Sequence, residues 1–329
     1  MARITLGLGT SHSPQLNTPP ETWLRHGEGD KRNPYLFDKT GKRTNWDDLA
    51  MQAGDSMAGQ LTPNQHQARF DRCNRAIAQL QSTLKEHQPG VVIVFGDDQG
   101  ELFPEDCRPA YHVHWGEELA NMPTLYTDSP NPLWRDAAWA YGVKGAVVPV
   151  PSAFAKHLVT SLMADGFDVA QSRHLAPGAG VGHAFGFVLG RIMNGLSIPL
   201  IPVVLNTMYG PNQPSPARCF DLGQAIAKAV RSWPEDLRVC MVGSGGLTHF
   251  VIDEEFDGQV ISALQAKDSE TLRSLRAERL NSGTSEIRSW LGAAGALQEA
   301  NLRMELIDYV PCYRSMAGTG VAMTFARWL

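Results

Sequence analysis

Short apolar runs alternate with longer amphipathic stretches along most of this chain. Four of the runs end in Gly, Asn, Asp or Ser, as buried strands commonly do, and they lie at positions 4–8, 91–95, 198–205 and 237–242. Between and after them, apolar residues recur at helical spacing, which predicts helices over 64–86, 153–165, 183–194, 217–232 and 286–296. The pattern therefore predicts strands that alternate with helices.

This alternation predicts an α/β fold in which a mostly parallel central sheet is flanked by helices. No linker-like stretch divides the chain, so we expect a single domain over residues 1–329. Residues 15–63 are polar and irregular but carry several aromatic residues, and we interpret them as a lid or interface segment. Ligands of parallel sheets bind beyond the carboxyl ends of the strands, where we expect the functional site.

Composition narrows the range of partners. The 329 residues are 43% hydrophobic and 19% charged, as in a globular protein. The net charge of −5 argues against a nucleic-acid partner, and no apolar run has the roughly 18–20 residues of a membrane span. The five cysteines are widely spaced without a CxxC pair, and the N-terminus has no signal-peptide pattern, so we expect a reduced, cytoplasmic protein.

Three of the ten histidines lie in loop-like segments of small residues, where a packed core has little use for them. His12 follows the first apolar run, and His183 lies within the glycine-rich residues 180–186. His249 follows the glycines of residues 243–246 and is itself followed by three consecutive acidic residues. Two histidines and one carboxylate can hold Fe(II) with positions left open for substrate and O₂. The three segments therefore predict a metal or acid–base site.

The carboxylates also have structural interpretations. Asp97 and Asp98 end the second apolar run, where such residues often cap a helix or form a turn. Glu254 and Glu255 begin a predicted helix, where acidic side chains complement the helix dipole. Considered singly, each structural interpretation is favoured; considered with the three histidines, the carboxylates become candidate ligands.

His112 and His114 alternate, so in a strand they share one face. Such pairs do bind metals, but a half-exposed polar strand face is the more common case. Their aromatic neighbours Tyr111 and Trp115 could equally form a wall for a ring-shaped substrate.

Together these motifs resemble the class III extradiol ring-cleavage dioxygenases, the superfamily of the protocatechuate 4,5-dioxygenase β subunit, and within it the gallate and 3-O-methylgallate branch. The resemblance implies that His12 is an iron ligand and that His183 is the catalytic acid–base. It further implies that residues 243–257 carry a glycine-rich turn and the iron carboxylate, for which Glu255 is favoured over Glu254.

The chain departs from this family at the second iron histidine. A gap-free register places Gln99 at that position, and a shift of one residue places Gly100 there. Gln99 could offer an amide oxygen, which is a weaker ligand than imidazole. Asp98, His112 or His114 could supply the third ligand instead. Otherwise iron binding is weak or absent, or another divalent metal is used.

The resemblance implies a dioxygenase that uses non-haem Fe(II) and O₂ on a small catecholic or gallate-like aromatic acid, assembled as a homodimer or a larger homo-oligomer. We expect His249 to join His183 in catalysis, and we expect substrate contacts from His112, His114, Asn206 and Arg218. The alternative is a diverged hydrolase, decarboxylase or isomerase on the same scaffold, without a metal or with a different one. A non-catalytic subunit that binds an aromatic acid is less consistent with His12, His183 and Glu255 occurring together.

Overall fold

A nine-stranded sheet runs through the computed structural model, which describes residues 1–329. Across the sheet the strands lie in the order β11 (His249–Val251), β13 (Thr319–Trp328), β1 (Arg3–Thr10), β10 (Arg238–Ser244), β4 (Val91–Asp97), β9 (Leu200–Leu205), β5 (Tyr111–His114) and β8 (Ala170–Ser172). The ninth strand, β12 (Met304–Tyr313), pairs along β13. Two small two-stranded sheets consist of β2 (Leu36–Phe37) with β3 (Arg43–Thr44), and of β6 (Glu118–Ala120) with β7 (Val147–Pro149).

The four central strands β1, β10, β4 and β9 are parallel and correspond to the four apolar runs of the sequence. Every residue of β4 and of β9 is buried, which explains why these runs are continuously apolar and do not alternate. Antiparallel pairing occurs further out, where β13 lies beside β1 and β5 lies beside β9. The predicted α/β class with a mostly parallel central sheet is confirmed.

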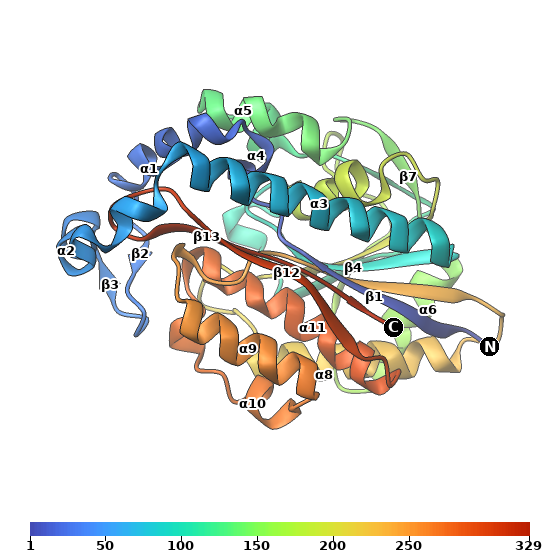
Figure 1. The fold of residues 1–329 in the computed structure, drawn as a ribbon. Coiled ribbons are helices and arrows are strands. Elements are labelled where there is room, and N and C mark those ends of the chain that lie inside the picture. Colours follow the sequence, from blue (N-terminus) through green and yellow to red (C-terminus); the bar gives the residue numbers. More distant parts are fainter.

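Helices cover both faces of the sheet (Figure 1). The long helix α3 (Pro63–His87) lies across one face, while α8 (Pro216–Ser232) and α11 (Ile287–Glu299) pack together on the other. The remaining helices are α1 (Trp23–Asp30), α2 (Trp46–Ala53), α4 (Thr124–Thr127), α5 (Pro132–Ala137), α6 (Ser152–Ala164), α7 (His183–Phe187), α9 (Glu254–Ala266) and α10 (Ser269–Arg273). The helix predicted over 183–194 begins as α7 and continues as a π-helical segment over Val188–Met193.

A single cluster of 82 buried apolar residues joins the sheet to the helices on both faces. This continuous core accounts for a single α/β domain. A second cluster has only three buried residues, Leu36, Leu49 and Ala317, and it packs against β11. None of the helices is both long and apolar enough to cross a membrane.

Residues 15–63 contain more regular structure than the sequence predicts, because α1, the β2–β3 hairpin and α2 all lie within them. Trp23 of α1 is fully buried. At the end of the same helix, the Asp30 carboxylate accepts two hydrogen bonds of 2.7 Å from the Arg314 guanidinium, and both side chains are buried. The prediction of an irregular segment was therefore wrong for these elements, and α1 is held firmly against the loop between β12 and β13.

Candidate metal and acid–base site

The carboxyl ends of the parallel strands meet at one edge of the sheet and carry the first members of the site. Thr10, at the end of β1, pairs with Ser244, at the end of β10. The next strand, β4, ends at Asp97, and the loop after β1 brings His12 to the same edge. The sequence-based expectation of a site at the strand ends therefore agrees with the geometry around His12.

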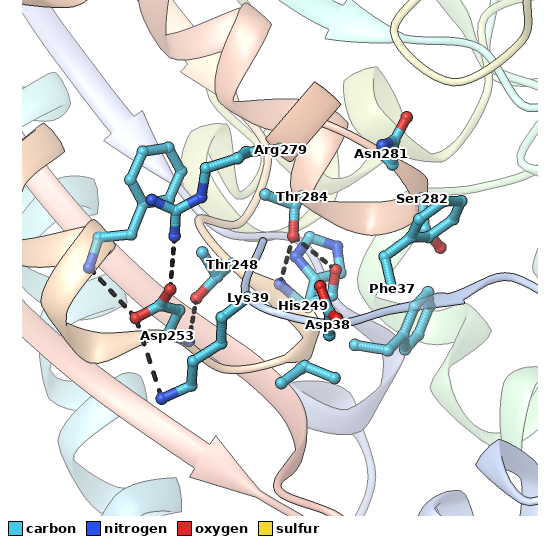
Figure 2. Close-up of a pocket in the computed structure, with 13 residues that line it drawn as sticks. Phe37, Asp38, Lys39, Thr248, His249, Asp253, Arg279, Asn281, Ser282 and Thr284 are labelled. Carbon is cyan, nitrogen blue, oxygen red and sulfur yellow. Dashed lines mark hydrogen bonds and ion pairs between the residues drawn. The ribbon is translucent and has the colours of Figure 1, made fainter. Parts of the chain in front are cut away.

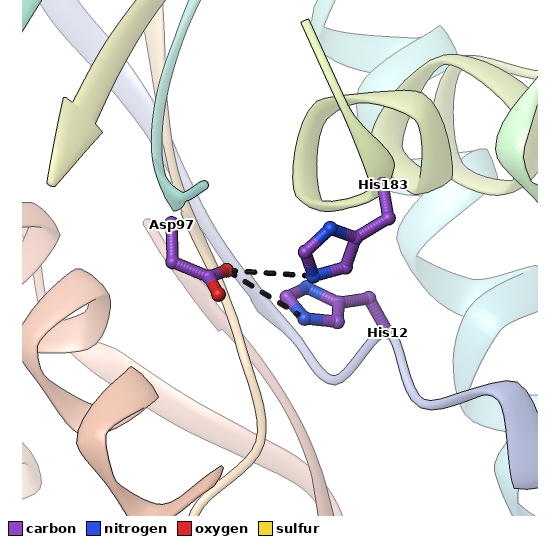
Figure 3. A group of neighbouring side chains, drawn as sticks. All are labelled: His12, Asp97 and His183. Atoms are coloured by element: carbon purple, nitrogen blue, oxygen red, sulfur yellow. Dashed lines mark ion pairs between the residues drawn. The ribbon is translucent and has the colours of Figure 1, made fainter. Parts of the chain in front are cut away.

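Three unpartnered atoms converge there (Figure 3). The Nε2 atoms of His12 and His183 lie 3.9 Å and 3.7 Å from Oδ1 of Asp97, and the ligand atoms of the three residues all lie within 4.8 Å of one another. All three atoms are buried and have no hydrogen-bond partner. Because buried polar atoms without partners are energetically expensive, such a convergence points to a ligand shared between them.

The hydrogen bonds of Ser244 determine which nitrogen of His12 faces the cluster. The Ser244 hydroxyl donates to the carbonyl oxygen of Ala184 at 2.7 Å. It can therefore only accept from Nδ1 of His12, which lies 3.0 Å away. The proton of a neutral His12 ring then sits on Nδ1, and Nε2 presents a free lone pair, as a metal ligand must.

Glu286 is the carboxylate nearest to His12. Its Oε2 lies 3.4 Å from His12 Nε2, and its Oε1 lies 3.3 Å from His249 Nε2. The backbone N–H of Gly246 also donates to Oε2, at 2.6 Å. Burial opposes ionisation of this carboxyl, but the neighbouring His12 and His249 rings lower its pKa well below the usual value. Glu286 is therefore a buried carboxylate beside Nε2 of His12.

The ring of His183 is held from behind by Glu101, whose Oε2 lies 2.5 Å from Nδ1. Burial opposes protonation of His183, but the negative charges of Glu101 and Asp97 outweigh it and raise the pKa to about 10. A divalent cation would offset the charge of the nearby carboxylates and move this pKa back toward neutrality.

The loop after β4 uses its polar residues in different ways. The Nε2 of Gln99 donates to Oδ2 of Asp97 at 3.1 Å and leaves Oδ1 free. Asp98 accepts the backbone N–H groups of Leu102 and Phe103 at 2.7 Å and 3.1 Å, so its interpretation as a turn-forming residue fits the structure. Gln99, the position that departs from the family pattern, therefore contacts the carboxylate of Asp97, which faces the cluster.

The donor set fits a divalent metal of the iron type. His12 offers an imidazole nitrogen, while Asp97 and Glu286 offer carboxylate oxygens, all from buried side chains. Imidazole and carboxylate ligands suit Fe(II) as well as neighbouring divalent metals. His183 Nε2 faces the same volume and could serve either as a further donor or as an acid–base.

Glu255 does not belong to this group. It is exposed in the first turn of α9, and the structure does not bring it to His12. Asp253 caps that helix by accepting the N–H of Phe256, so the turn buries Phe256 and directs Glu255 to solvent. The exposed position of Glu255 therefore contradicts the expectation that it is an iron ligand. Glu286 is the carboxylate that lies beside His12.

His112 and His114 are also outside the cluster. Both lie within hydrogen-bonding distance of the Ser172 hydroxyl, at 2.9 Å and 2.8 Å, across the β5–β8 pair. Burial and the neighbouring His114 lower the pKa of His112 to about 3, so this ring is neutral at physiological pH. Nδ1 of His112 has no partner, and its ring packs against Phe103.

The other two expected substrate residues have local contacts. Asn206 holds its own loop, because its side chain donates to the Tyr209 carbonyl oxygen at 2.6 Å and accepts the Tyr209 N–H at 3.1 Å. Arg218 is exposed on α8, with its guanidinium 4.0 Å from the centre of the Phe167 ring. Both side chains are therefore engaged in contacts within their own surroundings.

A small pocket is lined in part by His249 and is partly covered by the β2–β3 hairpin (Figure 2). Lys39 and Arg279 approach its rim, and both are near the carboxylate of Asp253. Its volume of about 20 Å³ is that of roughly one water molecule, too small for an aromatic ring in this conformation.

Sequence reasoning gave no role to Glu101 and Glu286, the two carboxylates that contact the site histidines. Glu286 ends a run of small residues immediately before α11, which resembles an ordinary helix start. Glu101 follows Asp97 by four residues in an acidic loop. The acidic loop offered a weak signal, whereas nothing local to Glu286 distinguished it.

Comparisons with known proteins place the chain in a family. Residues 56–323 match the family model described as "Catalytic LigB subunit of aromatic ring-opening dioxygenase", a range that includes Asp97, His183 and Glu286 but not His12. Gallate dioxygenase of Pseudomonas putida is 28% identical over 179 residues, which cover 50% of this chain and 51% of that enzyme. The 2,3-dihydroxyphenylpropionate/2,3-dihydroxicinnamic acid 1,2-dioxygenase of Klebsiella pneumoniae is 28% identical over 184 residues, which cover 56% and 51%. The chain thus spans about half the length of these relatives.

Proposed function

We propose that this chain, which belongs to the family of catalytic LigB subunits of aromatic ring-opening dioxygenases, opens the ring of a small catecholic or gallate-like aromatic acid with O₂. The observation that carries the proposal is the convergence of His12 Nε2, His183 Nε2 and Asp97 Oδ1, buried and without partners, at the carboxyl ends of the sheet. The relatives that act on gallate and on dihydroxyphenylpropionate support this substrate class.

His12, Asp97 and Glu286 would hold Fe(II) in this proposal. Fe(II), when bound, would bring the dihydroxy ring and O₂ together and let electrons pass from the ring to O₂, which amino-acid side chains do not do. Gln99 keeps Oδ2 of Asp97 occupied and so directs Oδ1 to the cluster. His249 stands behind Glu286 and orients that carboxylate, which makes it a positioning residue.

His183 is the acid–base of the proposed reaction. Because its Nδ1 is engaged by Glu101, only Nε2 faces the cluster. Nε2 takes the proton of a phenolic hydroxyl as the substrate binds, and it returns that proton to the ring-opened product. The proton is conserved over the cycle, and a positioned imidazole contributes on the order of 10²–10⁴-fold to such transfers.

Oxygen consumption tests this function. Protein loaded anaerobically with Fe(II) is mixed with gallate, 3,4-dihydroxybenzoate or 2,3-dihydroxyphenylpropionate, with 4-hydroxybenzoate as a control that lacks adjacent hydroxyls. We expect one O₂ consumed per ring opened with at least one dihydroxy acid and none with the control. Protein with full iron content that consumes O₂ with none of these compounds would overturn the proposal.

A further inference from the structure

Glu101 makes contacts that an ordinary loop carboxylate would not make. Its side chain is 2% exposed, and its Oε2 lies 2.5 Å from Nδ1 of His183. Both carboxylate oxygens also accept the backbone N–H of His183, at 3.0 Å each. A Cβ atom at Gly182 would lie 1.9 Å from Oε2 of Glu101, so only glycine at position 182 permits this approach. The carboxylate and the histidine are thus built to fit against each other.

We propose that Glu101 is the positioning residue of His183 and that the two act as a buried carboxylate–histidine dyad. Glu101 keeps a proton on Nδ1, which directs the lone pair of Nε2 into the cluster. Its negative charge also stabilises the imidazolium that forms when Nε2 accepts the substrate proton. The inference rests on the proposed ring-opening function, because it concerns the acid–base of that reaction.

The loop after β4 supports this assignment through the order of its contacts. Asp97 faces the cluster, Gln99 donates to Asp97, and Glu101 contacts His183. One short loop therefore orients both a candidate metal ligand and the candidate acid–base. A substitution in this loop would therefore alter the orientation of both groups, as expected of residues that hold metal ligands and catalytic side chains in place.

A purely structural role for Glu101 is the competing explanation. Helix α7 begins at His183, and its N-cap residue Gly182 has no side chain to accept the first N–H groups. Glu101 accepts the N–H of His183 and so could act only as a helix cap. The two explanations differ in what they require, because a cap needs an oxygen whereas the dyad also needs a negative charge.

Glu101→Gln separates them. The amide oxygen of Gln can replace Oε2 and accept the same two hydrogens of His183, so the cap is kept while the charge is lost. We expect kcat to fall about 10- to 100-fold, the loss typical when the carboxylate partner of an active-site histidine is removed. We expect KM and iron content to change less than twofold. Glu105→Gln, an exposed residue of the same loop, is the matched control and should retain wild-type kcat.

A double-mutant cycle completes the test. If Glu101 acts through His183, adding Glu101→Gln to His183→Gln should reduce kcat by less than twofold further. Full additivity, or wild-type kcat in a folded Glu101→Gln protein, would overturn the inference. Should Glu101→Gln not fold, Glu101→Asp keeps the charge but withdraws it by one methylene; wild-type kcat in that variant would equally overturn it. Inactive wild-type protein with full iron content would instead count against the proposed function.

Discussion

At the scale of single residues, the orientation of each site histidine is set by the partner of its Nδ1 atom. Ser244 accepts from Nδ1 of His12, and Glu101 contacts Nδ1 of His183. Nδ1 of His249 lies 2.7 Å from the carbonyl oxygen of Leu247. In all three cases Nε2 is left to face a carboxylate or the shared volume. These partners determine the chemistry as much as the histidines do.

His183→Gln tests the acid–base role. We expect turnover to fall about 10²–10⁴-fold, because Gln cannot exchange a proton at neutral pH. Unfolding midpoint and iron content should remain close to those of the wild-type protein, since His183 is not among the proposed ligands. Loss of thermal stability with unchanged turnover per folded molecule would instead identify a structural histidine, and loss of iron would identify a ligand.

Glu286→Gln and Glu255→Gln form a matched pair for the carboxylate ligand. Glu286 lies 3.4 Å from His12 Nε2, whereas Glu255 is exposed on α9. We expect Glu286→Gln to reduce iron content to a small fraction of wild type and Glu255→Gln to leave it unchanged, measured by metal analysis of protein loaded in the same way. The opposite result would restore Glu255 as the ligand.

The sequence motifs located two residues that the fold brings together, although their roles remain proposals. His12 and His183 stand in segments of small residues that leave room for a reactive side chain, and both face the cluster. Glu286 was missed because its role depends on how the start of α11 packs next to His12, and the local sequence does not encode this long-range contact. Gln99 was predicted to bind the metal through its amide oxygen. In the structure its amide nitrogen donates to Asp97.

At the scale of elements, the N-terminal segment is joined to the C-terminal hairpin by a buried ion pair. The two hydrogen bonds between Asp30 and Arg314 are supplemented by Thr319, whose hydroxyl donates to Asp30 at 2.6 Å. The Gln15 side chain accepts from Arg314 as well, at 3.2 Å. This network therefore connects α1 to β13 and to the loop that follows β1.

Asp30→Ala tests the importance of that connection. Removing one partner leaves a buried guanidinium uncompensated, so we expect the free energy of unfolding to fall by about 3–5 kcal/mol. Glu299→Ala removes the partner of Arg231 in a pair that is largely exposed, and it should cost at most about 1 kcal/mol. Urea unfolding of both variants measures the difference. Equal effects would mean that α1 is not held by this pair.

The sequence predicted the parallel centre of the sheet but not its antiparallel edge. Strands β4 and β9 are buried along their whole length, so they form short continuous apolar runs that can be recognised in the sequence. Strand β12 has a mixed burial pattern and β13 is almost wholly buried, so the two differ in pattern although they pair along their length. Pairing of β13 with β1 joins opposite ends of the chain, and such long-range contacts leave no local signal.

At the scale of the whole molecule, the proposed metal ligands come from distant parts of the chain. His12 follows β1, Asp97 ends β4, and Glu286 precedes α11, on the face of the sheet opposite α3. A metal that binds only when these elements are assembled stabilises the complete fold by mass action, by about 2.7 kcal/mol at a hundredfold excess over its dissociation constant.

Anaerobic addition of Fe(II) should therefore raise the unfolding midpoint of the wild-type protein. His12→Ala should show little or no such increase, because it lacks the imidazole donor. Differential scanning calorimetry with and without a chelator provides the comparison. An equal increase in both proteins would show that iron binds elsewhere on the molecule.

The central claim, that the chain opens aromatic rings with O₂, is tested most directly by following the oxygen atoms. Iron-loaded protein is supplied with its dihydroxy aromatic acid and with ¹⁸O-labelled dioxygen in unlabelled water, and the product is analysed by mass spectrometry. A dioxygenase must place label from O₂ in the new carboxylate of a ring-opened product. A product whose new oxygen comes only from water would contradict the account and would identify a hydrolytic enzyme on this scaffold.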